Sequence, residues 1–245
     1  MAVTVGNSGA EVYEVSAGGV ASVEFTPGWS PTGAAKCLVV GVSSVNGTAG
    51  NITGVTRNGG SETFIEALDV IYQPAGYEPN VGIYYFLNPG SSGSIIVTFP
   101  TSREGIGIGV ANLNGVDSIT PVDTATSQTG QNSPASITHT ADADDLLICV
   151  LAAQDMTTGT ITVGADQAVV MSFSYTESAA GWTHAMSTQP GTANDVLSYT
   201  FPESGDYWLM GAVAFKPYID PDHYGTPRDH SGVKPYSSLW RPARA

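Results

Sequence analysis

The feature that most constrains the fold is a pair of alternating apolar runs separated by a turn, within residues 81–100 (VGIYYFLNPGSSGSIIVTFP). The first run, VGIYYFL, is rich in the aromatic and branched residues that suit a pleated strand, and the second, SIIVTF, continues the two-residue period. Between them, NPGSSG supplies a proline that presets one turn dihedral and glycines that tolerate positive ones. The pattern predicts a β-hairpin and favours an all-β fold.

Other apolar runs extend this interpretation to most of the chain. Residues 36–45 (KCLVVGVSSV) and 145–153 (DLLICVLAA) predict buried central strands. Residues 105–113 (GIGIGVANL) alternate glycine with branched residues, leaving room that the aromatic side chains of residues 81–87 could fill. Shorter alternating runs predict strands at residues 3–5, 11–16, 20–25, 167–175, 181–188, 195–201 and 207–215.

Turn residues punctuate these runs. An Asn-Gly dipeptide between residues 51–58 and residues 62–70 predicts a second hairpin, because this pair favours tight turns. A helix over residues 62–70 is the alternative, weakened by their β-branched and aromatic members. Residues 115–133 are polar and show no periodicity, which predicts a surface excursion rather than core.

The composition agrees with short strands joined by many turns. Only 12% of the 245 residues are charged, and 29 are glycine. We predict an antiparallel β-sandwich, jelly-roll-like, over residues 1–216, followed by an extended C-terminal arm over residues 217–245. The arm contains five prolines, which favour extended backbone, and its large rings would gain burial only against another surface.

The charge distribution bears on partners. The formal net charge of −14 argues against nucleic acid or an anionic membrane as the main partner, because both require clustered Lys and Arg. Residues 1–216 hold four basic and 19 acidic residues, whereas residues 217–245 hold four basic and three acidic ones. Assembly contacts are therefore predicted in the arm, at Tyr218, Tyr224, Arg228, Lys234, Tyr236, Trp240, Arg241 and Arg244.

The two cysteines, Cys37 and Cys149, each lie in one of the buried apolar runs. This predicts buried free thiols, with a disulfide between neighbouring strands as the less favoured alternative. The first residues, MAVTVGNSGAEVYEV, show no basic segment followed by a continuous apolar one, and nowhere do 18 apolar residues run together. Neither a secretion signal nor a membrane span is predicted, and the protein is expected to be made in a cytoplasm and to stay soluble.

Several segments follow one another in a distinctive order: ITGVTRNGG, YYFLNPGSSGSIIVTF, ANLNGVDSITPVDT, ADADDLLICVLAA and WLMGAVAFKP. Over about residues 36–217 this order resembles a largely uncharacterised β-sandwich module found in tailed-phage structural proteins and in bacterial surface or secreted proteins. The resemblance implies a jelly-roll-like or immunoglobulin-like scaffold and transfers no catalytic residue. The arm and the lack of a signal peptide favour the phage branch.

Signs of catalysis are weak, and no enzymatic activity is predicted. Glycoside hydrolysis needs two carboxyl groups facing each other across a groove, but Glu62 and Glu66 would share the solvated face of one strand. The chain has no G-x-S-x-G nucleophile motif. His139 and His184 lie in polar contexts with no partner identifiable from sequence, which predicts surface imidazoles.

Two acidic patterns are weak metal candidates. Asp142, Asp144 and Asp145 could offer the oxygen ligands that Ca²⁺ takes, although a charged turn before a buried strand explains them as well. The repeated Asp-His pairs of the arm, at residues 222–223 and 229–230, could bind a transition metal, but a proline-rich frame holds ligands poorly. No cofactor is predicted, with Ca²⁺ as the one alternative.

Binding of a sugar would need aromatic faces near loops or strand ends. Trp29 and Trp182 are the first candidates for glycan contact, and Tyr72, Tyr77 and Tyr207 lie in similar positions. The same residues could equally pack in the core, and the sequence leaves both interpretations open.

These observations lead to two functional hypotheses. The first is a non-enzymatic phage virion structural protein, assembled in the host cytoplasm. It would be a homo-oligomeric capsid decoration or cement subunit, or a head-fibre base, tied by its arm to other capsid or tail subunits. The second is a carbohydrate-binding or host-attachment module of a phage tail, with a host glycan as partner.

Overall fold

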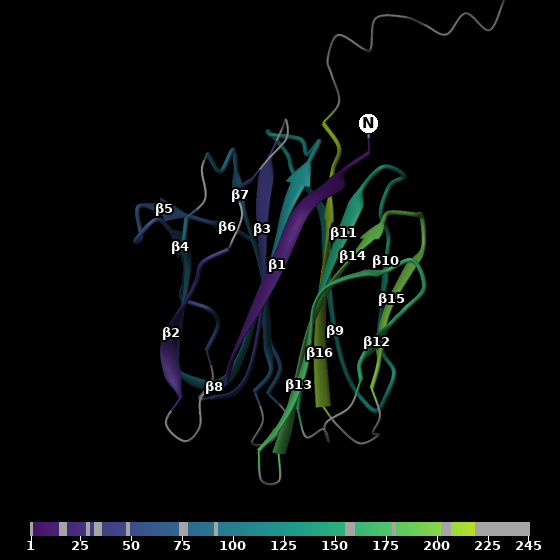
Figure 1. The fold of residues 1–245 in the computed structure, drawn as a ribbon. Helices are drawn as coiled ribbons and strands as arrows, with labels where there is room; N and C mark the ends of the chain where they lie inside the picture. Colours follow the sequence, from purple (N-terminus) through teal and green to yellow (C-terminus); the bar gives the residue numbers. More distant parts are fainter. Residues whose placement is uncertain are drawn as a thin grey trace, which may run out of the picture.

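The structure is a computed structural model that describes residues 2–14, 19–27, 30–31, 36–47, 50–73, 78–90, 93–154, 160–177, 180–201 and 207–218. The regular elements of these residues are all β-strands, paired antiparallel into three sheets (Figure 1). The predicted antiparallel β-sandwich is therefore confirmed. Among the described residues, no helix has the length and apolar character needed to cross a membrane.

The strands divide cleanly along the chain. Sheet 1 contains β1 (Thr4–Glu14), β2 (Val20–Phe25), β3 (Cys37–Gly47), β4 (Gly54–Arg57), β5 (Glu62–Thr63), β6 (Ile65–Ile71), β7 (Asn80–Leu87) and β8 (Ile95–Asn114). Sheet 2 contains β9 (Val122–Gln131), β11 (Leu146–Gln154), β13 (Ala168–Glu177), β14 (Ala180–Pro190) and β16 (Tyr207–Phe215). Sheet 3 contains β10 (Ala135–His139), β12 (Thr162–Val163) and β15 (Asp195–Thr200).

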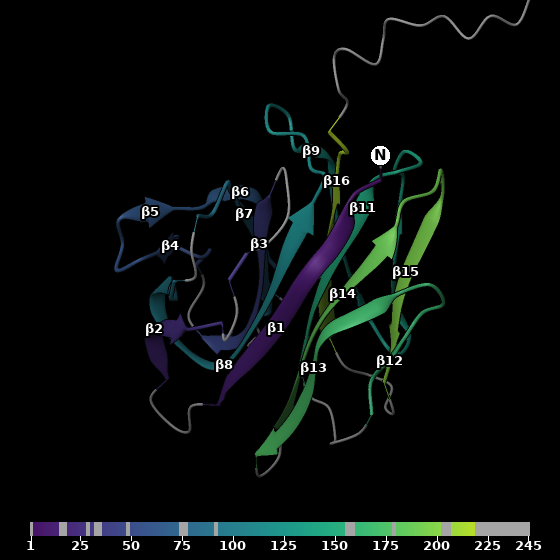
Figure 2. The same ribbon diagram turned by 45° about the horizontal axis from the view of Figure 1, so that its top comes forward.

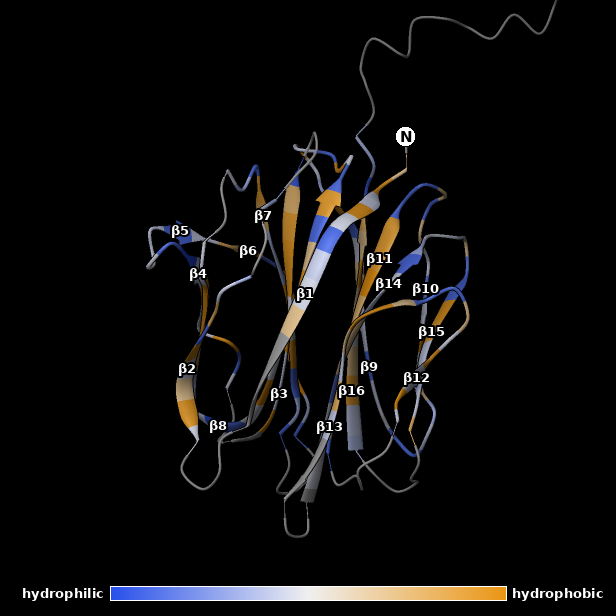
Figure 3. Cartoon of the chain, in the orientation of Figure 1, coloured by the Kyte–Doolittle hydropathy of each residue, from blue (hydrophilic) through white to orange (hydrophobic). Residues whose placement is uncertain are grey.

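The three sheets form successive layers, with sheet 2 in the middle (Figures 1 and 2). Even-numbered residues of β11, such as Ile148 and Val150, face sheet 1, while odd-numbered ones, such as Leu147 and Leu151, face sheet 3. This two-sided burial explains the continuous apolar sequence of β11, which is orange along its length in Figure 3. A simple two-layer sandwich would leave one of these faces in water.

Sheet 1 has a core of its own, because it curls into a half-barrel. Strand β8 is 20 residues long and pairs with β2 and β4 through its first part, then with β1 and β3 through its second. The concave side of the curl encloses Leu38, Val40, Val97 and Ile108, among others. Strand β3 is thus buried on both faces, as its apolar run predicts.

The hairpin predicted for residues 81–100 is wrong in its pairing. The two strands exist as β7 and the start of β8, but β3 lies between them in sheet 1 and pairs with both. Alternation in the sequence indicates that a segment is a strand but not which strand it pairs with. Here the apolar strand β3, from earlier in the chain, pairs with the edge of β7 and with the edge of β8 that a hairpin would have joined. The second hairpin is confirmed only at its turn, where β4 and β5 pair around Asn58, Gly59 and Gly60 in positive-φ conformations. The rest of its predicted second strand forms β6 and pairs with β7 instead.

Two more predictions are wrong in part, for the same kind of reason. The polar residues 115–133 lie mostly at the surface rather than in the core, as predicted, but they contain the ten-residue strand β9. Residues 3–5 and 11–16, predicted as separate strands, belong largely to the single strand β1, which continues through the Asn-Ser-Gly segment with a register shift after Val5. Strand β1 pairs along the apolar part of β8, and β9 pairs along the apolar β16. The pairing partner, rather than the weak alternation in their own sequences, therefore determines that these segments are strands.

The glycine-alternating strand interlocks with the opposite sheet. Cβ atoms added at Gly107 and Gly109 would lie 2.7 Å from Cβ of His184 and 2.5 Å from Sδ of Met186. Glycine therefore leaves room for large side chains, as predicted, but β14 of sheet 2 supplies these side chains rather than residues 81–87. Gly41, which pairs with Gly109 in register, completes the depression that receives Met186.

Replacing Gly107 by alanine is expected to lower the free energy of unfolding by about 1–3 kcal/mol, because the new methyl group meets the Cβ of His184, which cannot rotate away. Chemical denaturation followed by far-UV circular dichroism measures this loss. Gly90→Ala is the matched control, since no atom lies within 4 Å of its added Cβ. Equal stability of the two variants would contradict the interlock.

The cysteines are buried free thiols, as predicted. Cys37 and Cys149 are both fully enclosed and unpaired. Burial raises the pKa of Cys149 to about 12 and also raises that of Cys37, so both stay protonated and unreactive at neutral pH. Their role is packing within two different cores.

Candidate functional site

The last described residues, 216–218, lie at one end of the sandwich, which we call the exit, and backbone hydrogen bonds anchor them there. Lys216 N donates to Pro121 O at 2.8 Å, Asp117 N donates to Lys216 O at 2.9 Å, and Tyr218 N donates to Gly115 O at 2.6 Å. Pro217 also forms an isolated β-bridge with Val116. The loop between β8 and β9 thus holds the last described residues in place.

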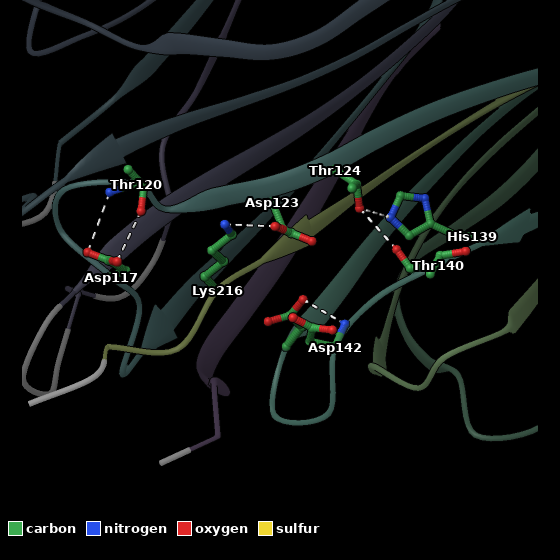
Figure 4. A network of polar contacts seen from close by, with 9 residues as sticks. Asp117, Thr120, Asp123, Thr124, His139, Thr140, Asp142 and Lys216 are labelled. Carbon is green, nitrogen blue, oxygen red and sulfur yellow. Dashed lines mark hydrogen bonds and ion pairs between the residues drawn. The ribbon is translucent and has the colours of Figure 1, made fainter. Parts of the chain in front are cut away.

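The loop that anchors the exit has its own internal support. The carboxylate of Asp117 accepts a hydrogen bond from Ile119 N at 2.8 Å. It also accepts one from the Thr120 hydroxyl at 3.1 Å, which Figure 4 shows. The bond from Ile119 N is the main cause of a lowered pKa at Asp117. This turn presents the side chain of Ile119, which is 87% exposed, on the same loop that binds Tyr218, which is 43% exposed.

An ion pair ties the exit to β9. Lys216 Nζ lies 2.7 Å from Asp123 Oδ1 (Figure 4), and this hydrogen bond is the main cause of a raised pKa at Lys216. Both side chains are partly exposed, so the pair orients the chain more than it stabilises the fold.

The N-terminus lies at the same end of the molecule (Figure 1). Val3 N donates to Asp144 O at 3.0 Å, in the turn that precedes β11. Asp145 N and Asp142 O close this turn at 3.2 Å, while Asp145 Oδ2 accepts from Asp142 N at 3.1 Å. Burial is the main cause of a raised pKa at Asp145, which Asp123 and Asp142 raise further.

The three aspartates that were weak Ca²⁺ candidates lie in one turn but differ in exposure. Asp145 is buried and caps the turn, whereas Asp142 and Asp144 are exposed, Asp144 with a positive φ of 82°. Within the described ranges, no group of three or more His, Cys, Asp or Glu side chains is placed to hold a metal ion. The other candidate pairs, Asp222 with His223 and Asp229 with His230, lie outside the described residues.

His139 belongs to this polar end, and the prediction of a surface imidazole is wrong for it. The residue is 1% exposed, and its Nε2 lies 2.8 Å from Thr124 Oγ1. That hydroxyl donates to Thr140 O at 3.0 Å (Figure 4). Because its one hydrogen is used there, Nε2 carries the proton in the neutral ring. Burial lowers the pKa of His139, against the opposing effect of Asp195 and Asp123.

His184 is also buried, at 1% exposed, far from the exit in the interlock between sheets 1 and 2. Its Nδ1 lies 2.8 Å from Ser43 Oγ. The residues next to His184 in the sequence are polar, which suggested exposure. However, alternate side chains of β14, including that of His184, lie between sheets 1 and 2. Neither histidine has an exposed nucleophile beside it among the described contacts.

The predicted aromatic residues take different positions. Trp182 is 3% exposed and packs in the core between sheets 1 and 2, so its ring offers no face to a ligand. Tyr72 and Tyr207 form a half-buried pair with ring centroids 6.2 Å apart, at the end of β16 opposite the exit. Trp29 and Tyr77 lie outside the described residues.

Glu62 and Glu66, the two carboxylates considered for glycoside hydrolysis, lie on two different strands rather than on one. Glu62 lies on β5 and binds Arg57 at 3.2 Å and Asn58 at 2.9 Å, whereas Glu66 is exposed on β6. A second polar cluster in sheet 1 was missed by the sequence reasoning. There Asp69 accepts from Asn80 at 2.9 Å and from Tyr84 at 3.0 Å, and burial is the main cause of its raised pKa.

The predicted assembly arm begins at the anchored exit. Of its residues, Tyr218 is described, while Tyr224, Arg228, Lys234, Tyr236, Trp240, Arg241 and Arg244 lie outside the described residues. No protein-family model matches the chain, and no curated protein matches its sequence significantly.

Proposed function

We propose that this protein is a non-enzymatic structural subunit of a phage virion, a decoration or cement subunit of the capsid or the base of a head fibre. Residues 217–245 would attach it to neighbouring subunits. The observation that carries the proposal is the anchored exit, where three backbone hydrogen bonds and a β-bridge fix the point from which this segment leaves the sandwich.

The chemistry on the two sides of the exit supports an attachment role. The sandwich is strongly acidic, whereas the segment beyond the exit contains Arg228, Lys234, Arg241 and Arg244. These cations suit acidic patches on a neighbouring copy or subunit, and the rings of the segment would supply apolar burial. The exposed side chains of Ile119 and Tyr218 extend the apolar contact surface onto the sandwich itself.

Ending the chain after Tyr218 is expected to leave the sandwich as stable as before but to prevent its incorporation into particles. Tyr218 is retained because its backbone contributes to the anchor. The measurements are thermal unfolding of the purified protein and mass spectrometry of purified particles.

A full-length variant with glutamine at residues 228, 234, 241 and 244 separates charge from length. It is expected to reduce incorporation relative to the unmodified chain, and this difference is expected to shrink at higher salt, because salt screens the attraction that the four cations supply. Undiminished incorporation of the truncated chain would contradict the proposal.

The second candidate, a carbohydrate-binding or host-attachment module of a phage tail, is favoured by one observation. Tyr72 and Tyr207 form a half-buried ring pair at the end of the sandwich away from the exit. Such a pair could stack against a sugar while the other end is attached. Glycan-array binding by the chain that ends at Tyr218 would favour this candidate over the first.

A further inference from the structure

Strand β9 forms one edge of sheet 2. Its single strand partner among the described residues is β16, so the outward backbone N–H and C=O groups of alternate residues have no partner strand. Most of its side chains are exposed, namely Thr124, Ala125, Ser127, Gln128, Thr129 and Gln131. Such an edge is a template for another strand.

The other long edges carry register shifts or carboxylates that discourage pairing, and in β9 such features are confined to its start, at Asp123 and the register shift between Val122 and Ala125. Strand β1 has a register shift after Val5 and lies against β13, which has a shift after Val169. Strand β6 has a register shift after Glu66 and carries two carboxylates. Edge strands β5 and β12 have only two residues each. In contrast, residues 125–131 pair with β16 without irregularity, and residues 124–131 (TATSQTGQ) contain neither charge nor proline.

We propose that β9 pairs antiparallel with β9 of a second copy about a two-fold axis, which joins two five-stranded sheets into one continuous sheet. An antiparallel strand edge is self-complementary under a two-fold axis, so one sequence satisfies both sides. The pairing places threonine, serine and glutamine side chains across from each other, which suits cross-strand hydrogen bonds.

Charge and proline content favour a second copy over other occupants. The chain carries a net charge of −14, and an uncharged eight-residue stretch is where two such molecules can approach with little repulsion. A charged peptide would find no opposite charge along residues 124–131. Residues 217–245 contain five prolines, each lacking the N–H that a sheet edge requires. This proposal therefore does not depend on the proposed role of that segment.

The test is sedimentation velocity of the full chain over a range of concentrations. Wild type is expected to dimerise, and Ser127→Lys is expected to raise the dimer dissociation constant at least about tenfold, because two lysines meet near the axis. Ser172→Lys is the matched control, since Ser172 is an exposed serine on β13 at the opposite edge of the same sheet. Thermal unfolding of both variants establishes that they fold.

Hydrogen exchange provides the second readout. Amides of alternate residues within 125–131 are expected to become more protected as wild type dimerises, and to lose this protection in Ser127→Lys. A wild-type chain that stays monomeric would overturn the proposal. So would a dimer that Ser127→Lys leaves intact, or one that is lost only when residues 219–245 are removed.

Discussion

Replacing Trp182 by alanine is expected to lower the free energy of unfolding by about 3–5 kcal/mol. The side chain is 3% exposed and lies in the core between sheets 1 and 2. Its Cε3 atom lies 3.2 Å from the position of a Cβ at Gly105, so the ring fills space that glycine leaves open. Removing the ring creates a cavity between two sheets packed face to face, and this cavity can close only if whole strands move.

Urea denaturation followed by far-UV circular dichroism measures this loss, because the signal does not depend on the tryptophan. Ile119→Ala is the matched apolar truncation, expected to change stability by less than about 0.5 kcal/mol because Ile119 is 87% exposed. Near-normal stability of Trp182→Ala would contradict the packing. That outcome is what a tryptophan dedicated to sugar binding would give.

Acidification is expected to destabilise the sandwich through His184. Burial lowers the pKa of this imidazole from 6.5 to about 3 in the folded protein. Below pH 6.5 the unfolded chain therefore binds a proton that the folded protein excludes. The contribution to the free energy of unfolding falls by at most about 1.4 kcal/mol per pH unit until the folded pKa is reached.

The His184→Gln variant isolates this effect. Glutamine can still form a hydrogen bond with Ser43 but does not titrate, so the variant is expected to lose less stability than wild type between pH 6.5 and 3. Asp69 and Asp145 have raised pKa values and act with the opposite sign, but both variants share them and their contributions cancel. Parallel stability curves across this range would contradict the assignment.

Sequence patterns predicted the parts of the fold that depend on local burial. The apolar runs at residues 36–45 and 145–153 became β3 and β11, because a long apolar segment has to be enclosed wherever it pairs. The Asn-Gly turn after β4 was predictable since its conformation depends on the turn residues alone. The end of strand β16 at Phe215 agrees with the loss of alternation after it.

The candidate site was less predictable because distant residues build it. Lys216 meets Asp123, and His139 meets Thr124, through pairings that arise only when β9, β10 and β16 come together. Nothing in the polar sequence of β9 indicated a strand, since its structure comes from the apolar β16 beside it. His139 is buried because β10 belongs to a third layer, and His184 is buried because β14 interlocks with the glycines of β8. No local sequence pattern indicates either arrangement.

The division of strands along the chain has a consequence for biosynthesis. Every strand of sheet 1 ends by residue 114, and every strand of sheets 2 and 3 begins at residue 122 or later. On the ribosome, sheet 1 can complete its hydrogen bonding while β11 and β16 are still being translated. Its face bearing Val39, Ile83 and Leu113 then stays uncovered. A nascent chain that has completed sheet 1 therefore exposes this apolar face, to which a chaperone recognising apolar surface could bind, until the strands of sheet 2 are translated.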